Sequence, residues 1–193
     1  MIRPLFITLF LLIFCASAAL AAPPRPRPYS GCGVLQLKPD PTTEKSRIVL
    51  YQEPGLLRAA EFEPSLLPRL AGSPVEPLLA VNARRGGWTR IAYDDAGREG
   101  WIEQARAWEY RTWREFLPGR LLRILPGMKK ALYAVRSEPR EEATENETVT
   151  RDQVVRLLQV EGEWARLQAP SGWFRWRDGD GRLTVSLEAP EGV

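Results

Sequence analysis

One pattern of features occurs twice in this chain, and it limits the fold more than any other part of the sequence. Each copy has a β-rich run ending near a proline, an irregular loop, an apolar strand, a glycine turn into a tryptophan, and a later Gly-Trp pair. In the first copy these parts are residues 48–55 (IVLYQEPG), 78–81 (LLAV), 86–93 (GGWTRIAY) and 100–102 (GWI). In the second they are residues 132–139 (LYAVRSEP), 154–160 (VVRLLQV), 162–167 (GEWARL) and 172–174 (GWF).

The residues around the first tryptophan of each copy alternate with a period of two. Trp88, Arg90 and Ala92 alternate with Thr89 and Ile91, and residues 164–167 behave likewise. A period of two next to a glycine turn is typical of a hairpin strand. About four or five short strands in roughly 60 residues is the density of a small β-barrel.

Three segments of the second copy carry a resemblance to a known family. Residues 135–139 (VRSEP), 163–167 (EWARL) and 172–174 (GWF) resemble the opening, the central tryptophan strand and a later strand of the bacterial SH3-like (SH3b) domain. The first copy is similar in order but has a longer, proline-rich loop, and the two copies cover roughly two thirds of the chain. The resemblance implies five-stranded barrels with a long first loop over one face. Members are often exported and tied to the cell envelope; several bind peptidoglycan or its cross-links, and others scaffold an enzyme domain.

We therefore expect an all-β chain of two small SH3-like barrels in tandem. The expected parts are a signal peptide at 1–21, a Pro/Arg-rich linker at 22–44, barrel 1 at 45–111, a linker at 112–130, barrel 2 at 131–187 and a tail at 188–193. In the second linker, Thr112 is placed to cap a short helix through Leu117, ended by Pro118 and Gly119.

The first residues of the chain have the pattern of a secretory signal. Arg3 supplies a basic start, residues 5–15 are apolar apart from Thr8, and small residues precede an expected cleavage before Ala22. The apolar run is shorter than the ~20 residues that span a bilayer. We expect export to the periplasm or medium with no membrane span after cleavage, and a retained anchor stays open. Cys32 would then be the only cysteine, with its role open.

The residue types present exclude most catalytic classes. The chain has no histidine and two cysteines, so histidine-based catalysis and cysteine-rich or histidine-containing metal sites are absent. No glycine-rich phosphate loop occurs. The formal charge of +3 is too small to indicate nucleic acid. Residues 178–181 (DGDG) are interpreted as a hairpin turn because the other ligands of a calcium loop are missing. We expect no enzyme, no cofactor and no metal.

Binding is expected at an aromatic groove in each barrel. Trp88 with Tyr51, and Trp164 with Tyr133, are the candidate ligand-binding pairs, although packing would explain Trp88 and Trp164 equally well. Such a groove suits an extended peptide, and the acidic loop 138–147 would favour a cationic ligand. The later tryptophans, 101 and 173, are expected in the core.

Two functions remain. The first is an exported envelope module that binds peptidoglycan peptide or another extended peptide. The alternative is a structural or assembly scaffold that docks an envelope protein and does not bind the cell wall. An open groove would favour the first function, and a groove filled by the chain's own loop, 53–77, would favour the second. The oligomeric state stays open.

Overall fold

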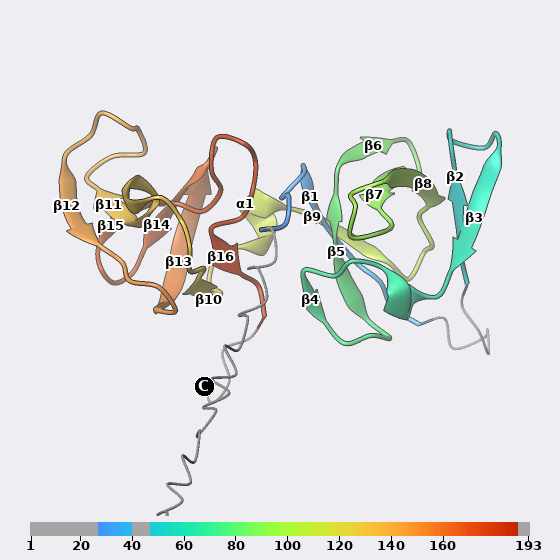
Figure 1. Cartoon of the computed structure of the whole chain (residues 1–193), viewed down its shortest axis with the longest axis horizontal. Coiled ribbons are helices and arrows are strands. Elements are labelled where there is room, and N and C mark those ends of the chain that lie inside the picture. The colour runs from blue at the N-terminus through green and yellow to red at the C-terminus, as the bar shows by residue number, and fades with distance from the viewer. Residues whose placement is uncertain (1–26, 40–46, 189–193) are drawn as a thin grey trace, which may run out of the picture.

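A computed structural model describes residues 27–39 and 47–188, and these form three antiparallel β-sheets (Figure 1). The expected all-β fold class is confirmed. None of the three sheets closes into a barrel within the described residues, so the two separate barrels stay a prediction. The expected signal peptide, the first residues of the Pro/Arg linker and most of the expected tail lie outside the described residues.

Two sheets make up a first lobe and the third makes up a second lobe. The four-stranded sheet has the order β4 (Ala71–Gly72), β5 (Pro77–Val81), β1 (Gly33–Gln36), β9 (Glu109–Thr112). The five-stranded sheet has the order β3 (Arg58–Phe62), β2 (Ile48–Tyr51), β8 (Glu99–Glu103), β7 (Trp88–Ala92), β6 (Ala83–Arg85). The seven-stranded sheet has the order β12 (Glu145–Thr148), β11 (Ala134–Arg136), β15 (Gly172–Arg175), β14 (Trp164–Leu167), β13 (Val154–Glu161), β10 (Leu121–Ile124), β16 (Val185–Ser186).

The four-stranded sheet is a wall that is buried on both faces. Leu35 and Leu79 pack into the core of the first lobe, whereas their neighbours Val34 and Leu78 pack into the core that fills the second lobe. Strands buried on both faces have continuous apolar runs instead of alternating ones, and residues 77–81 (PLLAV) fit this rule. The wall therefore separates two cores and supplies side chains to both.

Strand β1 occupies the centre of this wall. It pairs along its length with β5 on one side and β9 on the other. The linker expected at 22–44 thus contains a strand. The short apolar run 33–37 forms it because the neighbouring strands β5 and β9 bury its side chains. The linker expected at 112–130 likewise contains β10, which pairs with β13 and β16.

The short helix predicted in the second linker is confirmed as α1 (Trp113–Phe116). Thr112 is its N-cap, and Glu115 completes a capping box by accepting the Thr112 backbone N–H at 2.9 Å. The helix lies between the two lobes (Figure 1). Two short 3-10 helices, η1 (Pro64–Leu66) and η2 (Lys130–Tyr133), complete the elements.

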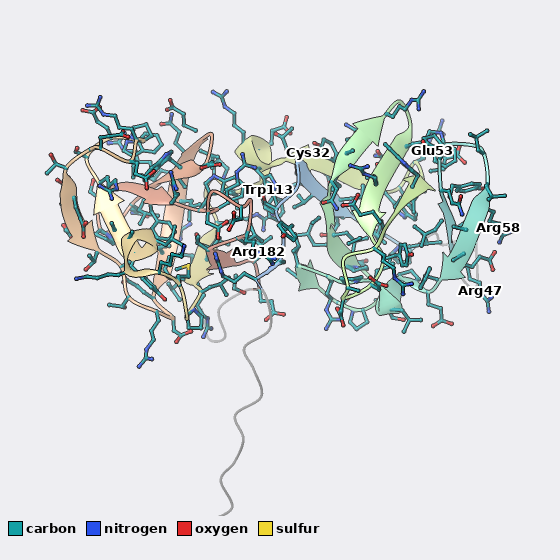
Figure 2. All side chains as sticks on the ribbon, turned by 45° about the horizontal axis from the view of Figure 1, so that its top comes forward. Cys32, Arg47, Glu53, Arg58, Trp113 and Arg182 are labelled. Atoms are coloured by element: carbon teal, nitrogen blue, oxygen red, sulfur yellow. The ribbon has the colours of Figure 1, made fainter. Side chains whose placement is uncertain are left out.

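Residues 27–32, which precede β1, form a strap that joins the lobes. The Ser30 N–H donates to the Gly181 carbonyl at 2.8 Å in the second lobe, and the Cys32 N–H donates to the Val81 carbonyl at 2.7 Å in the first. The buried Trp113 indole donates to the Ser30 carbonyl at 2.9 Å. Figure 2 shows Cys32, Trp113 and Arg182 together in the middle of the molecule.

An ion pair fixes the beginning of the strap. Arg27 Nη2 lies 2.5 Å from Asp178 Oδ2, and Asp178 is only 7% exposed. Its other oxygen accepts the backbone N–H groups of Asp180 and Arg182 at 3.0 and 2.9 Å, so the side chain closes the 178–181 turn as the sequence predicts. Burial opposes ionisation of Asp178, but the Arg182 N–H and the Arg27 guanidinium outweigh burial and hold its pKa below the usual range.

Replacing Arg27 by alanine is expected to lower the free energy of unfolding by about 1.5–3 kcal/mol at pH 7, as for a lost hydrogen bond to a charged group. Because the folded pKa of Asp178 is depressed, the contribution is present above its unfolded pKa of about 4 and is lost as pH falls through the folded pKa. Urea unfolding of parent and variant between pH 7 and pH 2.5 measures both effects.

Arg47→Ala is the matched control, because Arg47 lies 3.5 Å from Glu61 in an exposed pair, worth about 0–1 kcal/mol. Equal losses in the two variants, or a loss for Arg27→Ala that does not depend on pH, would contradict the assignment.

Candidate functional site

The five-stranded sheet turns one face toward the core of the first lobe and the other outward. Thr89 and Ile91 of β7 are fully buried, whereas Trp88 and Arg90 are half-buried on the opposite face. Across the sheet, Arg90 is opposite Trp101 in β8, and Trp101 is opposite Tyr51 in β2. Because cross-strand partners share a face, the structure brings three aromatic side chains together. We call them, with Arg90 and Glu103, the first outer face.

Tyr51 and Trp88 are in direct contact, as the sequence predicts for this pair. Their ring centroids are 5.0 Å apart with an interplanar angle of 85°, which is a favourable edge-to-face geometry. The turn after β2 lies beside Trp88, since a Cβ on Gly55 would be 3.9 Å from the indole ring. The same turn exposes Leu56 and Leu57, by 75% and 62%.

The second lobe repeats this arrangement strand for strand. Arg166 of β14 is opposite Trp173 of β15, in the register that joins Arg90 to Trp101. Trp164 of β14 is opposite Arg175. These four residues and Arg136 form the second outer face. The repeat in the sequence is therefore also a repeat in strand register.

The two outer faces differ in whether the first tryptophan is covered. Trp164 is only 9% exposed, and Arg175 lies over its ring with Cζ 5.0 Å from the centroid. Arg175 Nη2 lies 3.3 Å from Glu141 and 3.9 Å from Glu163. Part of the acidic loop, which the sequence suggests as an attraction for a cationic ligand, is therefore paired within the chain.

Tyr133 does not join Trp164 in the way that Tyr51 joins Trp88. It lies in η2, where its hydroxyl donates to the Leu125 carbonyl at 3.1 Å and accepts the Met128 N–H at 3.3 Å. The position of Tyr51 is taken by Arg136, which is opposite Trp173. This correspondence could have been found in the sequence, because aligning the two Glu-Pro pairs, 53–54 and 138–139, matches Tyr51 with Arg136 without a gap.

The later tryptophan of each copy was expected in the core, and this is wrong in both. Trp101 and Trp173 are half-buried on the outer faces. The reason is the preceding glycine: Gly100 faces inward so closely that a Cβ there would be 2.9 Å from Leu50 Cδ2. Because neighbours in a strand point to opposite faces, the tryptophan points outward.

Trp176, which follows β15, is fully buried at 1% exposure. Its indole donates to the Gly162 carbonyl at 3.0 Å, and its ring lies 5.1 Å from that of Trp113.

A cleft of about 720 Å³ lies beside the strap, between the lobes. Its lining includes Cys32, Trp113, Arg114, Glu161 and Arg177. The thiol of Cys32 is exposed, and the Tyr110 hydroxyl lies 3.9 Å from its sulfur. The pKa of Tyr110 is raised, first by burial and then by Cys32, so its hydroxyl keeps its proton at neutral pH and does not take one from the thiol.

Over residues 27–39 and 47–188, no three His, Cys, Asp or Glu side chains gather where they could hold a metal ion. None of the helices in these ranges has the length and apolar character to cross a membrane. Comparison with protein-family models, curated proteins and solved structures finds no match for this chain.

Removing the guanidinium that covers Trp164 is expected to expose the indole. Arg175→Ala should increase hydroxyl-radical oxidation of Trp164, read residue by residue by mass spectrometry, and cost about 0.5–2 kcal/mol of stability through the lost cation–π contact. Arg166→Ala, which removes an exposed arginine from the same strand face, is the control and should leave Trp164 unchanged. Unchanged oxidation of Trp164 in Arg175→Ala would contradict the assigned cover.

Proposed function

We propose that this chain is an exported, non-enzymatic binding module of the cell envelope, in which the first outer face holds an extended peptide such as the peptide part of peptidoglycan. The two lobes are interpreted as divergent SH3-like repeats, of which one binds and one is closed. The observation that carries the proposal is the contrast between the faces. Tyr51, Trp88 and Trp101 are each half-buried, and within the described residues no arginine lies over the Trp88 ring, whereas Trp164 is covered by Arg175.

The chemistry of this face suits a peptide. Rigid aromatic side chains supply a large contact area at a small cost in conformational entropy, and flat rings pack well on an extended chain. Arg90, held 3.0 Å from Glu99 beside the Trp101 ring, adds a polar group at the edge. Exposed Leu56 and Leu57 extend the apolar surface at the adjacent turn.

A protein partner is the second candidate, and a separate observation favours it. The long segment between β2 and β5 carries four strongly exposed apolar side chains: Leu56, Leu57, Leu66 and Val75, at 62–75% exposure. Contiguous exposed apolar surface is typical of sites that dock another protein, and in this second proposal the segment supplies that surface. A scaffold role would use this segment in place of a cell-wall ligand.

Co-sedimentation with purified peptidoglycan sacculi tests the proposal. Residues 22–193 are expected to pellet with sacculi, and Trp88→Ala is expected to abolish pelleting because it removes the centre of the aromatic face. Trp173→Ala is the matched control, since it truncates the half-buried tryptophan of the second outer face and should pellet like the parent. Circular dichroism establishes that both variants are folded.

Failure of the parent to pellet would overturn the cell-wall ligand and leave the scaffold role as the better proposal. Pelleting that is lost in Trp173→Ala and kept in Trp88→Ala would place binding on the second lobe and overturn the assignment to the first outer face.

A further inference from the structure

We infer that the ligand of the first outer face presents a cationic side chain, a guanidinium or a primary ammonium, to the ring of Trp88. The inference rests on the proposed function and names the chemistry of the ligand at one position. It comes from the second lobe, where the chain already places a cation of its own on the equivalent tryptophan.

The second lobe shows how this repeat holds a cation. Arg175 is opposite Trp164 in the strand register, lies over its ring at 5.0 Å, and is flanked by carboxylates at 3.3 and 3.9 Å. One carboxylate, Glu141, comes from the loop after β11, and the other, Glu163, precedes the tryptophan. An aromatic face with carboxylates at its edge is favourable for a guanidinium.

The first lobe has the aromatic face and carboxylates in the strand and the turn beside it, at positions other than those of Glu141 and Glu163, and it lacks the arginine. Glu103 takes the place of Arg175, directly opposite Trp88. Glu53 lies in the turn after β2, two residues before Gly55, which approaches the Trp88 ring. Within the described residues, neither carboxylate forms an ion pair, and no arginine lies over the Trp88 ring. A cation from a partner would complete what Arg175 completes in the second lobe.

The positive charge of Arg85 opposes this binding. Arg85 of β6 is opposite Trp88 on its other side, where the second lobe has Glu161 opposite Trp164. The charges beside the tryptophan are therefore exchanged between the lobes. Trp88 has an arginine beside it in β6 and a glutamate in β8. Trp164 has a glutamate beside it in β13 and an arginine in β15. Because Arg85 repels a cation, its removal should strengthen cation binding, whereas removal of Glu103 should weaken it.

The test uses two small probes that differ in charge and little in shape, N-acetyl-arginine amide and N-acetyl-citrulline amide. Indole resonances of the folded chain are followed by NMR after labelling its tryptophans with nitrogen-15 and assigning them by substitution. We expect the arginine probe, and not the citrulline probe, to shift the Trp88 resonance. Trp164 should respond to neither in the parent, because Arg175 occupies its ring.

Three variants make the test directional. Glu103→Gln should weaken the arginine probe at Trp88 by about two- to fivefold and Arg85→Gln should strengthen it, as for a partly exposed cation–π contact and its neighbouring charges. Arg175→Ala should make Trp164 respond to the arginine probe as Trp88 does. The last variant is a gain of response and cannot be mistaken for loss of folding.

Equal shifts with both probes, or no shift at Trp88 with either, would overturn the cationic ligand. The proposed function would survive that outcome if sacculi still pellet the parent and not Trp88→Ala. Loss of pelleting in the parent with a charge-selective shift at Trp88 would have the opposite meaning: the cation site stands, and its ligand is a protein.

Discussion

The backbone pairing of β1 with β5 and β9 is the constraint on which the rest of this structure depends. It completes a sheet whose two faces supply apolar side chains to two different cores, Leu35 and Leu79 to one and Val34 and Leu78 to the other. The strap before β1 then adds backbone hydrogen bonds and the Arg27–Asp178 pair on the second lobe. Burying charge and backbone in this way is favourable only because each group has a partner.

Besides the core that it shares with the wall, each lobe has one sheet face that points outward. The outward faces of β7–β8 and β14–β15 have the same register but different charges beside their first tryptophan. A cross-strand arginine lies over the Trp164 ring, whereas a glutamate is opposite Trp88. Under our proposal, a few differences in this hairpin distinguish the lobe whose aromatic face is closed from the lobe whose face binds.

The sequence predicted those parts of the fold that depend on local chemistry. Alternation in β7, the helix cap at Thr112 and the Asp178 turn each follow from neighbours a few residues apart, and each is found. The contribution of 33–37 to a sheet could not be predicted, because it depends on partners about 45 and 75 residues away. Tyr133 was assigned to the groove because Leu132-Tyr133 resembles Leu50-Tyr51, whereas the Glu-Pro pairs give the alignment that the structure has. Trp101 was assigned to the core although Gly100, its neighbour in the strand, faces inward. Of the candidate pairs, only Tyr51 with Trp88 is brought together.

Hydrogen–deuterium exchange of the chain beginning at residue 22, beside one beginning at residue 38, tests the central role of β1 most directly. The shorter chain lacks both the strap and β1. If the wall joins the lobes, backbone amides of the shorter chain should exchange faster than those of the longer chain in β5 and β9 of the first lobe. They should also exchange faster in α1 and the neighbouring end of β13 in the second lobe. Unchanged exchange in α1 and β13 would contradict this account and show that the two lobes are independent of β1.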